Sequence, residues 1–261
     1  MKKSGRKFVT LLFVCLSVWV FDEPRSAIAV GEYNGFWGGP IIFSSPDDPS
    51  FSETETAYLV IYQQGENELY LTIGFPSPLR LVKSGGSWVL PTPIWLTEPD
   101  FSALLTSFVI SFQAENSLTG SMTLESEGVR LGGTLSFTKY VCQILKNGST
   151  LSGLSGGKDS VRCYEIDLQS GATNLKITTW SGSGDCDLEV IYHRPNFDEY
   201  ISDDYGNKEQ VNIAAPYPGR WYIALYGFNS YSGLNLSLTY TPPSPSPAPM
   251  PWIPLLLLPD E

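Results

Sequence analysis

The stretch GSGDCDLEVIYHRP, residues 182–195, decides how the second half of the chain is interpreted. It places acidic side chains at alternate positions, Asp185, Asp187 and Glu189, and it ends beside His193, the only histidine of the chain. Its two glycines permit positive φ, and an aspartate can close a turn by accepting backbone N–H groups. The stretch therefore predicts a tight turn that enters a β-strand, in preference to a metal or catalytic centre.

Calcium is the alternative interpretation of the same acids. Ca²⁺ takes about six to eight oxygen ligands, mostly from carboxylates, carbonyls and water. The candidate ligands are Asp185, Asp187, Asp203 and Asp204, and no other cofactor is expected. The loop DDYGN, residues 203–207, lacks the length and spacing of an EF-hand loop, so the turn is favoured over the metal site.

The remainder of the chain carries strand patterns and no long amphipathic helix, which indicates an all-β fold. In residues 30–140 the strands pair as hairpins: AYLVIYQ (57–63) with ELYLTIGF (68–75), and LTGSMTLES (118–126) with VRLGGTLSFTK (129–139). An antiparallel meander must hide its edges, either by closing into a barrel or by packing two sheets, and the barrel is favoured here. A barrel-like domain that loosely resembles small lipocalin-like barrels is expected here, with an internal apolar cavity.

Several spaced motifs follow one another in residues 141–240: LKNGSTLSGLSG (145–156), CYEIDL (163–168), GSGDCDLEV (182–190) and PGRWYIALYGFNSYSGLNLSLTY (218–240). Together they resemble the bacterial pre-peptidase C-terminal (PPC) domain, in the order found in that family and over residues 143–240. The resemblance implies a β-sandwich of jelly-roll type, which in the family is appended to secreted peptidases. It also implies that the aspartates of the GDxDL turn are architectural.

Tyrosines of this second domain are candidate ligand-binding residues. In WYIALY (221–226) alternation sends the apolar set into the core and the tyrosines to the other face. Exposed aromatic side chains suit sugar rings or extended peptides. Collagen-binding members of the resembled family use surface tyrosines, so Tyr222, Tyr226 and Tyr231 are the expected binding residues.

The two ends of the chain are expected to lie outside both domains. Residues 1–29 combine a basic start, a short apolar run and a small-x-small site, which predicts a signal peptide cleaved near Ala29. The protein is then secreted or periplasmic, and bacterial in type. The apolar run is shorter than the about 20 residues that span a membrane, so no spanning segment is expected. Residues 241–261 are proline-rich and predict an extended tail.

Three cysteines remain after cleavage of the signal peptide: Cys142, Cys163 and Cys186. An oxidising compartment favours one disulfide and one remaining thiol. The expected pair is Cys163 with Cys186, because both lie in strand-like segments of one domain.

Composition and motifs argue against most enzyme chemistry. Without residues 1–29 the net charge is −14, which disfavours nucleic acid as a partner. One histidine cannot build an HExxH zinc site; no GxSxG motif occurs, and His193 is expected to be an exposed loop residue. The expected function is that of a non-catalytic accessory protein that binds an extracellular polymer or a secreted or envelope protein. The alternatives are a carboxylate-dependent glycan hydrolase and a carrier of small apolar ligands in the first domain.

Overall fold

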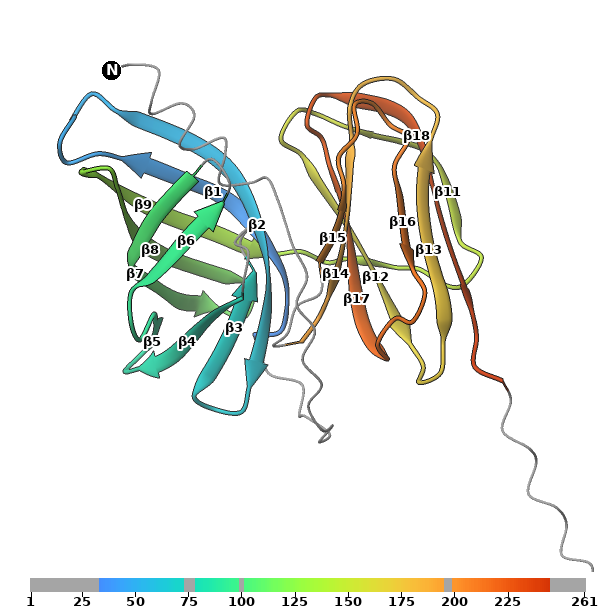
Figure 1. Ribbon diagram of the computed structural model, residues 1–261, viewed down its shortest axis with the longest axis horizontal. Coiled ribbons are helices and arrows are strands. Elements are labelled where there is room, and N and C mark those ends of the chain that lie inside the picture. Colours follow the sequence, from blue (N-terminus) through green and yellow to red (C-terminus); the bar gives the residue numbers. More distant parts are fainter. Residues whose placement is uncertain (1–32, 73–77, 99–100, 195–198, 245–261) are drawn as a thin grey trace, which may run out of the picture.

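The computed structural model describes residues 33–72, 78–98, 101–194 and 199–244. The expected signal peptide and residues 245–261 of the expected tail lie outside these ranges. The described residues form a barrel and a two-sheet sandwich that lie side by side (Figure 1), which confirms the all-β fold. Within them, no helix is long and apolar enough to cross a membrane.

The barrel is a meander in which nearly every strand pairs antiparallel with the next one along the chain. Two further pairings, β1 with β9 and β5 with β7, close eight strands into a barrel, and β6 adds to the edge of β7 beside β5. The strands are β1 (Gly35–Ser44), β2 (Ser52–Gln64), β3 (Glu68–Thr72), β4 (Leu79–Ser84), β5 (Ser87–Val89), β6 (Ile94–Glu98), β7 (Phe101–Ala114), β8 (Ser117–Ser126) and β9 (Val129–Lys139).

Alternation along the barrel strands sends one side chain in two to the interior, where Trp37, Phe43, Phe108 and Phe137 are fully buried. These belong to one contiguous cluster of buried hydrophobic residues contributed by all nine strands. Gly39 is required where β1 crosses β9, because a Cβ there would lie 2.2 Å from a backbone oxygen. The interior that was expected to offer an apolar cavity is thus filled by side chains of the described residues.

The sandwich consists of a five-stranded sheet, in the order β10-β12-β17-β14-β15, and a four-stranded sheet, in the order β11-β18-β13-β16. The inward residues of both sheets form a second core around Trp221, with Leu175, Leu188 and Leu236. The strands are β10 (Gln143–Ile144), β11 (Thr150–Gly156), β12 (Val161–Leu168), β13 (Thr173–Trp180), β14 (Asp187–Tyr192), β15 (Glu199–Ser202), β16 (Gln210–Ile213), β17 (Gly219–Tyr226) and β18 (Tyr231–Thr241).

The five-stranded sheet turns its outer face to β1 and β2 of the barrel (Figure 1), and a third hydrophobic cluster joins the two bodies. Phe36 and Val60 of the barrel are buried in this cluster together with Ile191, Tyr222 and Ala224 of the sandwich. The ring centroids of Phe36 and Tyr222 lie 5.9 Å apart, a spacing that is usual for aromatic pairs. The barrel therefore covers one of the two outer faces of the sandwich.

The disulfide joins Cys142 to Cys163, and Cys186 is a buried free thiol. The expected pairing of Cys163 with Cys186 is wrong. Cys163 alternates with the core residues Tyr164 and Ile166 of β12 and so faces the barrel, whereas Cys186 lies in the core between the sheets. The two sulfur atoms are on opposite faces of one sheet. Cys142 reaches Cys163 because the segment that links barrel and sandwich runs beside β12, where β10 pairs with it.

Candidate functional site

The turn at residues 182–186 is held by Asp185, which is 5% exposed. Its Oδ1 accepts the N–H of Gly206 at 2.7 Å, and its backbone oxygen accepts the N–H of Asn229 at 3.1 Å. Gly184 adopts a φ of +101°, and a Cβ there would lie 2.1 Å from the oxygen of Ser230. These contacts connect three loops of the sandwich, so the acid-rich stretch acts as a structural turn.

The four candidate calcium ligands are not gathered into a metal site. The carboxylate of Asp185 is occupied by a backbone N–H, and Asp203 and Asp204 are exposed. Burial raises the pKa of Asp187 to about 7, and repulsion from Asp185 adds to the shift. Within the described ranges, no three or more His, Cys, Asp or Glu side chains are placed to hold a metal ion. Calcium binding by these residues stays a prediction, which titration of Ca²⁺ into chelator-treated protein would test.

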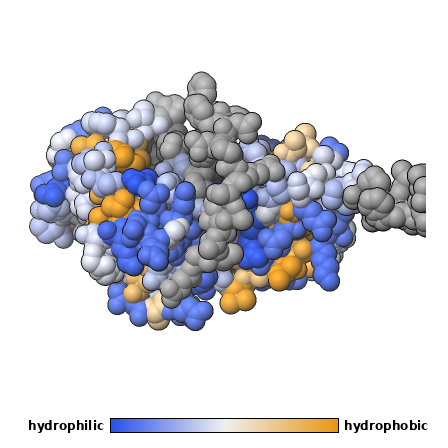
Figure 2. Space-filling view, turned by 90° about the horizontal axis from the view of Figure 1, so that it is seen from below, coloured by the Kyte–Doolittle hydropathy of each residue, from blue (hydrophilic) through white to orange (hydrophobic). Residues whose placement is uncertain are grey.

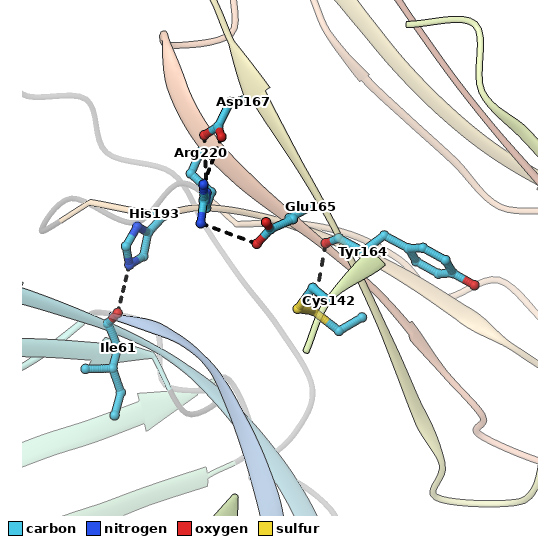
Figure 3. Close-up of polar contacts among 8 residues, drawn as sticks. Ile61, Cys142, Tyr164, Glu165, Asp167, His193 and Arg220 are labelled. Atoms are coloured by element: carbon cyan, nitrogen blue, oxygen red, sulfur yellow. Dashed lines mark hydrogen bonds and ion pairs between the residues drawn. A yellow bond between two sulfur atoms is a disulfide. The ribbon is translucent and has the colours of Figure 1, made fainter. Parts of the chain in front are cut away.

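His193 is a contact between the two bodies rather than the exposed loop residue that was expected. Its Nε2 lies 2.8 Å from the backbone oxygen of Ile61 in β2, as Figure 3 shows. The ring makes edge contacts with Tyr62 of the barrel and Tyr222 of the sandwich, at centroid distances of 5.3 and 5.4 Å. A carbonyl oxygen can only accept, so Nε2 carries the proton and donates it.

Burial lowers the pKa of His193 to about 4, so the imidazole is neutral at pH 7. Its environment offers an orienting hydrogen bond and two aromatic rings, and the described residues place no nucleophile against it. In the unfolded chain the ring takes its proton near pH 6.5, before the folded state does. His193 therefore reduces stability as the pH falls from about 6.5 to 4.

A pair of half-buried carboxyl groups, Glu189 on β14 and Glu199 on β15, faces the barrel beside Tyr58 of β2. Burial raises the pKa of Glu189 to about 8, and the charge of Glu199 adds to the shift. Burial also raises the pKa of Glu199 to about 7. The Tyr58 hydroxyl donates a hydrogen bond to Glu189 and has a pKa well above its usual value, chiefly through burial. At neutral pH the pair therefore retains protons that exposed glutamates would lose.

Glu189→Gln should raise the free energy of unfolding above that of the wild type, and the gain should be larger at pH 8 than at pH 4. The unfolded carboxyl titrates near 4.5 and the folded one near 8. The wild type thus loses stability as the pH rises through this window, and the amide does not. We expect a gain of about 1–2 kcal/mol at pH 8 and less than about 0.5 kcal/mol at pH 4, measured by urea unfolding. The exposed Glu125→Gln is the control; equal effects at both pH values would contradict the assignment.

Arg220 of β17 organises the other half of the covered sheet (Figure 3). Its guanidinium lies 2.9 Å from the carboxylate of Asp167 and 3.5 Å from that of Glu165 on β12. The neighbouring acids raise the pKa of Arg220 above its usual value, and the hydrogen bond to Asp167 is the largest cause. A single guanidinium thus pairs with two carboxylates on the neighbouring strand.

The three tyrosines expected to bind a ligand are not exposed. Tyr222 is 3% exposed because the barrel covers it, and Tyr231 is 3% exposed because it packs into the core of the sandwich. Tyr226 is half-buried at the edge of the interface, and its hydroxyl donates to Asp159 at 2.9 Å. The expectation of an exposed tyrosine surface is wrong, since it took this face of the sheet to be solvated.

The surface that faces away from the barrel has a different composition. The four strands of its sheet, β11, β13, β16 and β18, contain no Asp or Glu. Their outward side chains are mainly Ser, Thr, Asn, Gln and Lys, with Trp180 at 36% exposure. Exposed large hydrophobic side chains elsewhere include Ile42, Trp95 and Phe228. Figure 2 shows one face of the molecule, which is mostly hydrophilic with separate hydrophobic patches. Sequence reasoning did not single out this sheet, although its lack of acids is visible in the chain.

Comparison with known proteins identifies the sandwich. Residues 160–227, from just before β12 to just after β17, match the sequence model of the bacterial pre-peptidase C-terminal domain. The chain is 31% identical over 96 residues to the alkaline serine exoprotease A of Vibrio alginolyticus, covering 36% of this chain and 18% of that protein. It is 31% identical over 100 residues to a zinc metalloprotease of Helicobacter pylori, covering 37% and 38%.

A third relative is the virulence metalloprotease of Vibrio anguillarum, 33% identical over 96 residues, with 36% of this chain and 16% of that protein covered. The chain spans less than half the length of each of these three proteases. Among solved structures, the pre-peptidase C-terminal domain of a collagenase from Bacillus anthracis is 20% identical, with a TM-score of 0.30, and covers 38% of this chain and 94% of that domain.

Proposed function

We propose that this chain, which carries a bacterial pre-peptidase C-terminal domain, is an exported, non-catalytic accessory protein that binds an extracellular polymer or an envelope protein. The relatives named above are proteases, and their similarity to this chain is limited to about 100 residues. In this chain the structure beside the PPC domain is the barrel. The observation that supports the proposal is the packing of that barrel: its interior is a hydrophobic core, and its outer wall is fixed to the domain.

The barrel offers little to the two alternative functions. The fully buried polar residues of its described part are Ser45, Thr72 and Ser126, so no described carboxylate is fully buried in the barrel. Glu53 and Glu55 of β2 are half-buried. The surface acids Glu68 and Glu125 are paired with arginines. A carrier of apolar ligands needs an empty interior, whereas bulky side chains such as Trp37 and Phe108 occupy it. Both alternatives therefore have less support than a binding role.

The proposal is tested by a search for turnover with the purified chain lacking residues 1–29. Casein, gelatin and soluble glycans are incubated with the protein, and new amino termini and reducing ends are counted. We expect no increase above a buffer control, and no binding of a fluorescent apolar dye in the barrel. Turnover that disappears in a single carboxylate variant of the barrel would establish the hydrolase instead.

A further inference from the structure

The outer surface of the four-stranded sheet is the broad face of the sandwich that the barrel leaves free. The barrel covers the outer face of the other sheet, which carries the acids Glu165, Asp167, Asp187, Glu189 and Glu199. The free sheet has no acid in any of its strands, in a protein of strongly acidic composition. We name this free surface the acid-free face and define it by the outward side chains of β13, β16 and β18.

Hydrogen-bonding groups form rows across the acid-free face. Lys176 of β13 lies between Asn212 of β16 and Thr239 of β18 in the strand register. One position further along the face, Thr178 lies beside Gln210. The Thr178 hydroxyl is also 2.8 Å from that of Ser237. Hydroxyl and amide groups both donate and accept, as the hydroxyls of a sugar do. The only charge in these rows is the cation of Lys176.

Trp180 lies at one end of the face, opposite Asn235 in the register. An indole offers a large, rigid apolar surface at small entropic cost, and its N–H remains available to a polar partner. The remaining outward side chains are polar, so the face lacks the contiguous apolar patch that marks protein–protein contacts. A single aromatic side chain among amides and hydroxyls fits the alternating apolar and polar surface of a sugar ring.

A groove of about 480 Å³ lies at the other end of β13, within the range of small-molecule sites. Asn174, Lys176, Asn212 and Thr239 line it, and Tyr240 lies in its wall. It opens where the pairing of β13 with β18 shifts register. From Trp180 to Asn174 the strand runs about 20 Å, so a ligand that contacts both ends is a chain rather than a single sugar.

We propose that the acid-free face binds a neutral or weakly anionic polysaccharide, which lies along β13 from Trp180 to the groove at Asn174. The inference rests on the proposed binding function and names its surface and its ligand class. The absence of carboxylates removes the repulsion that the rest of this acidic protein would exert on a chain with acidic sugars, and Lys176 supplies one compensating charge.

Binding is tested by co-sedimentation of the chain lacking residues 1–29 with insoluble chitin, cellulose and purified peptidoglycan, and with gelatin–agarose as a protein polymer. At least one polysaccharide should retain the wild type. Trp180→Ala should weaken that binding by roughly tenfold or more, as for an aromatic anchor, and Asn212→Ala by a smaller factor. Because one lysine is the only charge involved, raised salt should change the affinity by less than about threefold.

Trp95→Ala is the matched control, because Trp95 is 66% exposed on the barrel strand β6. It should bind like the wild type, and thermal unfolding verifies that each variant is folded. Binding that survives Trp180→Ala and Asn212→Ala, or that is lost in Trp95→Ala, overturns the acid-free face as the site but leaves the accessory function standing. Retention by gelatin alone overturns the ligand class. Retention by none of the probes overturns the polysaccharide inference too, and the turnover assay then decides the proposed function separately.

Discussion

Replacing Phe36 with alanine is expected to lower the free energy of unfolding by about 3–4 kcal/mol and to separate the unfolding of the barrel from that of the sandwich. Phe36 is 1% exposed although it points away from the barrel interior. Its ring lies 5.3 Å from that of Tyr58, 5.6 Å from that of Tyr140 and 5.9 Å from that of Tyr222. Alanine leaves a cavity at the centre of the contact between the two bodies.

Differential scanning calorimetry measures this effect directly. The wild type should unfold in one transition, because the shared hydrophobic cluster couples the two bodies, and the variant in two. Ile42→Ala is the control on the same strand and the same face, since Ile42 is 45% exposed and lies away from the sandwich. It should change stability by less than about 1 kcal/mol. Two transitions already in the wild type would contradict the coupling of the two bodies through the shared cluster.

Gly184→Ala is the second large effect, with an expected loss of about 4 kcal/mol. The left-handed φ of +101° strains any side chain, and the added Cβ would lie 2.1 Å from the backbone oxygen of Ser230. The turn must then separate from the loop between β17 and β18, and the hydrogen bond from Asn229 to Asp185 is lost with it. Urea unfolding of the purified variant measures the loss.

Gly206→Ala separates the two causes of that loss. Gly206 has a similar φ of +112°, but nothing lies within 4 Å of the Cβ position. It should therefore show the backbone strain alone, roughly 1–2 kcal/mol. If the two variants lose equal stability, the close approach of Gly184 to Ser230 contributes nothing and the turn is less constrained than described.

The strands, the closed meander and the PPC domain could be predicted from the sequence, because period-2 patterns and turn glycines are local features. Alternation also correctly separated Leu188 and Val190 from Asp187 and Glu189 on the two faces of β14. The same local reasoning predicted a tight turn at GDCDL from its glycines, whereas the contacts of Asp185 with Gly206 and Asn229 come from distant parts of the chain.

The contact between the two bodies was missed, although the sequence carries a signal for it. AYLVIYQ in β2 and WYIALY in β17 are apolar at consecutive positions rather than at alternate ones. Such runs are typical of strands that are buried on both faces. Tyr58 and Val60 face the sandwich while Leu59 and Ile61 fill the barrel. The prediction that Tyr222 and His193 are exposed was wrong because it took the outer face of the five-stranded sheet to be solvated.

The disulfide depends on which face of a sheet each cysteine occupies and on the path of the linker. Alternation along CYEIDL places Cys163 on the face opposite to the core residues of its strand. Cys186 lies two residues before the core residue Leu188 and so shares its face. That information argued against joining them. The approach of Cys142 to Cys163 follows from the parallel pairing of β10 with β12, which no local pattern reveals.

The most direct test of a non-catalytic binding role is one sedimentation experiment in which both the pellet and the supernatant are assayed. The chain lacking residues 1–29 is incubated with insoluble polysaccharide and with gelatin–agarose, and the pellet is assayed for bound protein and the supernatant for soluble fragments of the polymer. The account predicts saturable binding to a polysaccharide with no release of fragments over many hours. Fragment release that scales with protein concentration would contradict the non-catalytic role, and a pellet free of protein on every polymer would contradict the polysaccharide site.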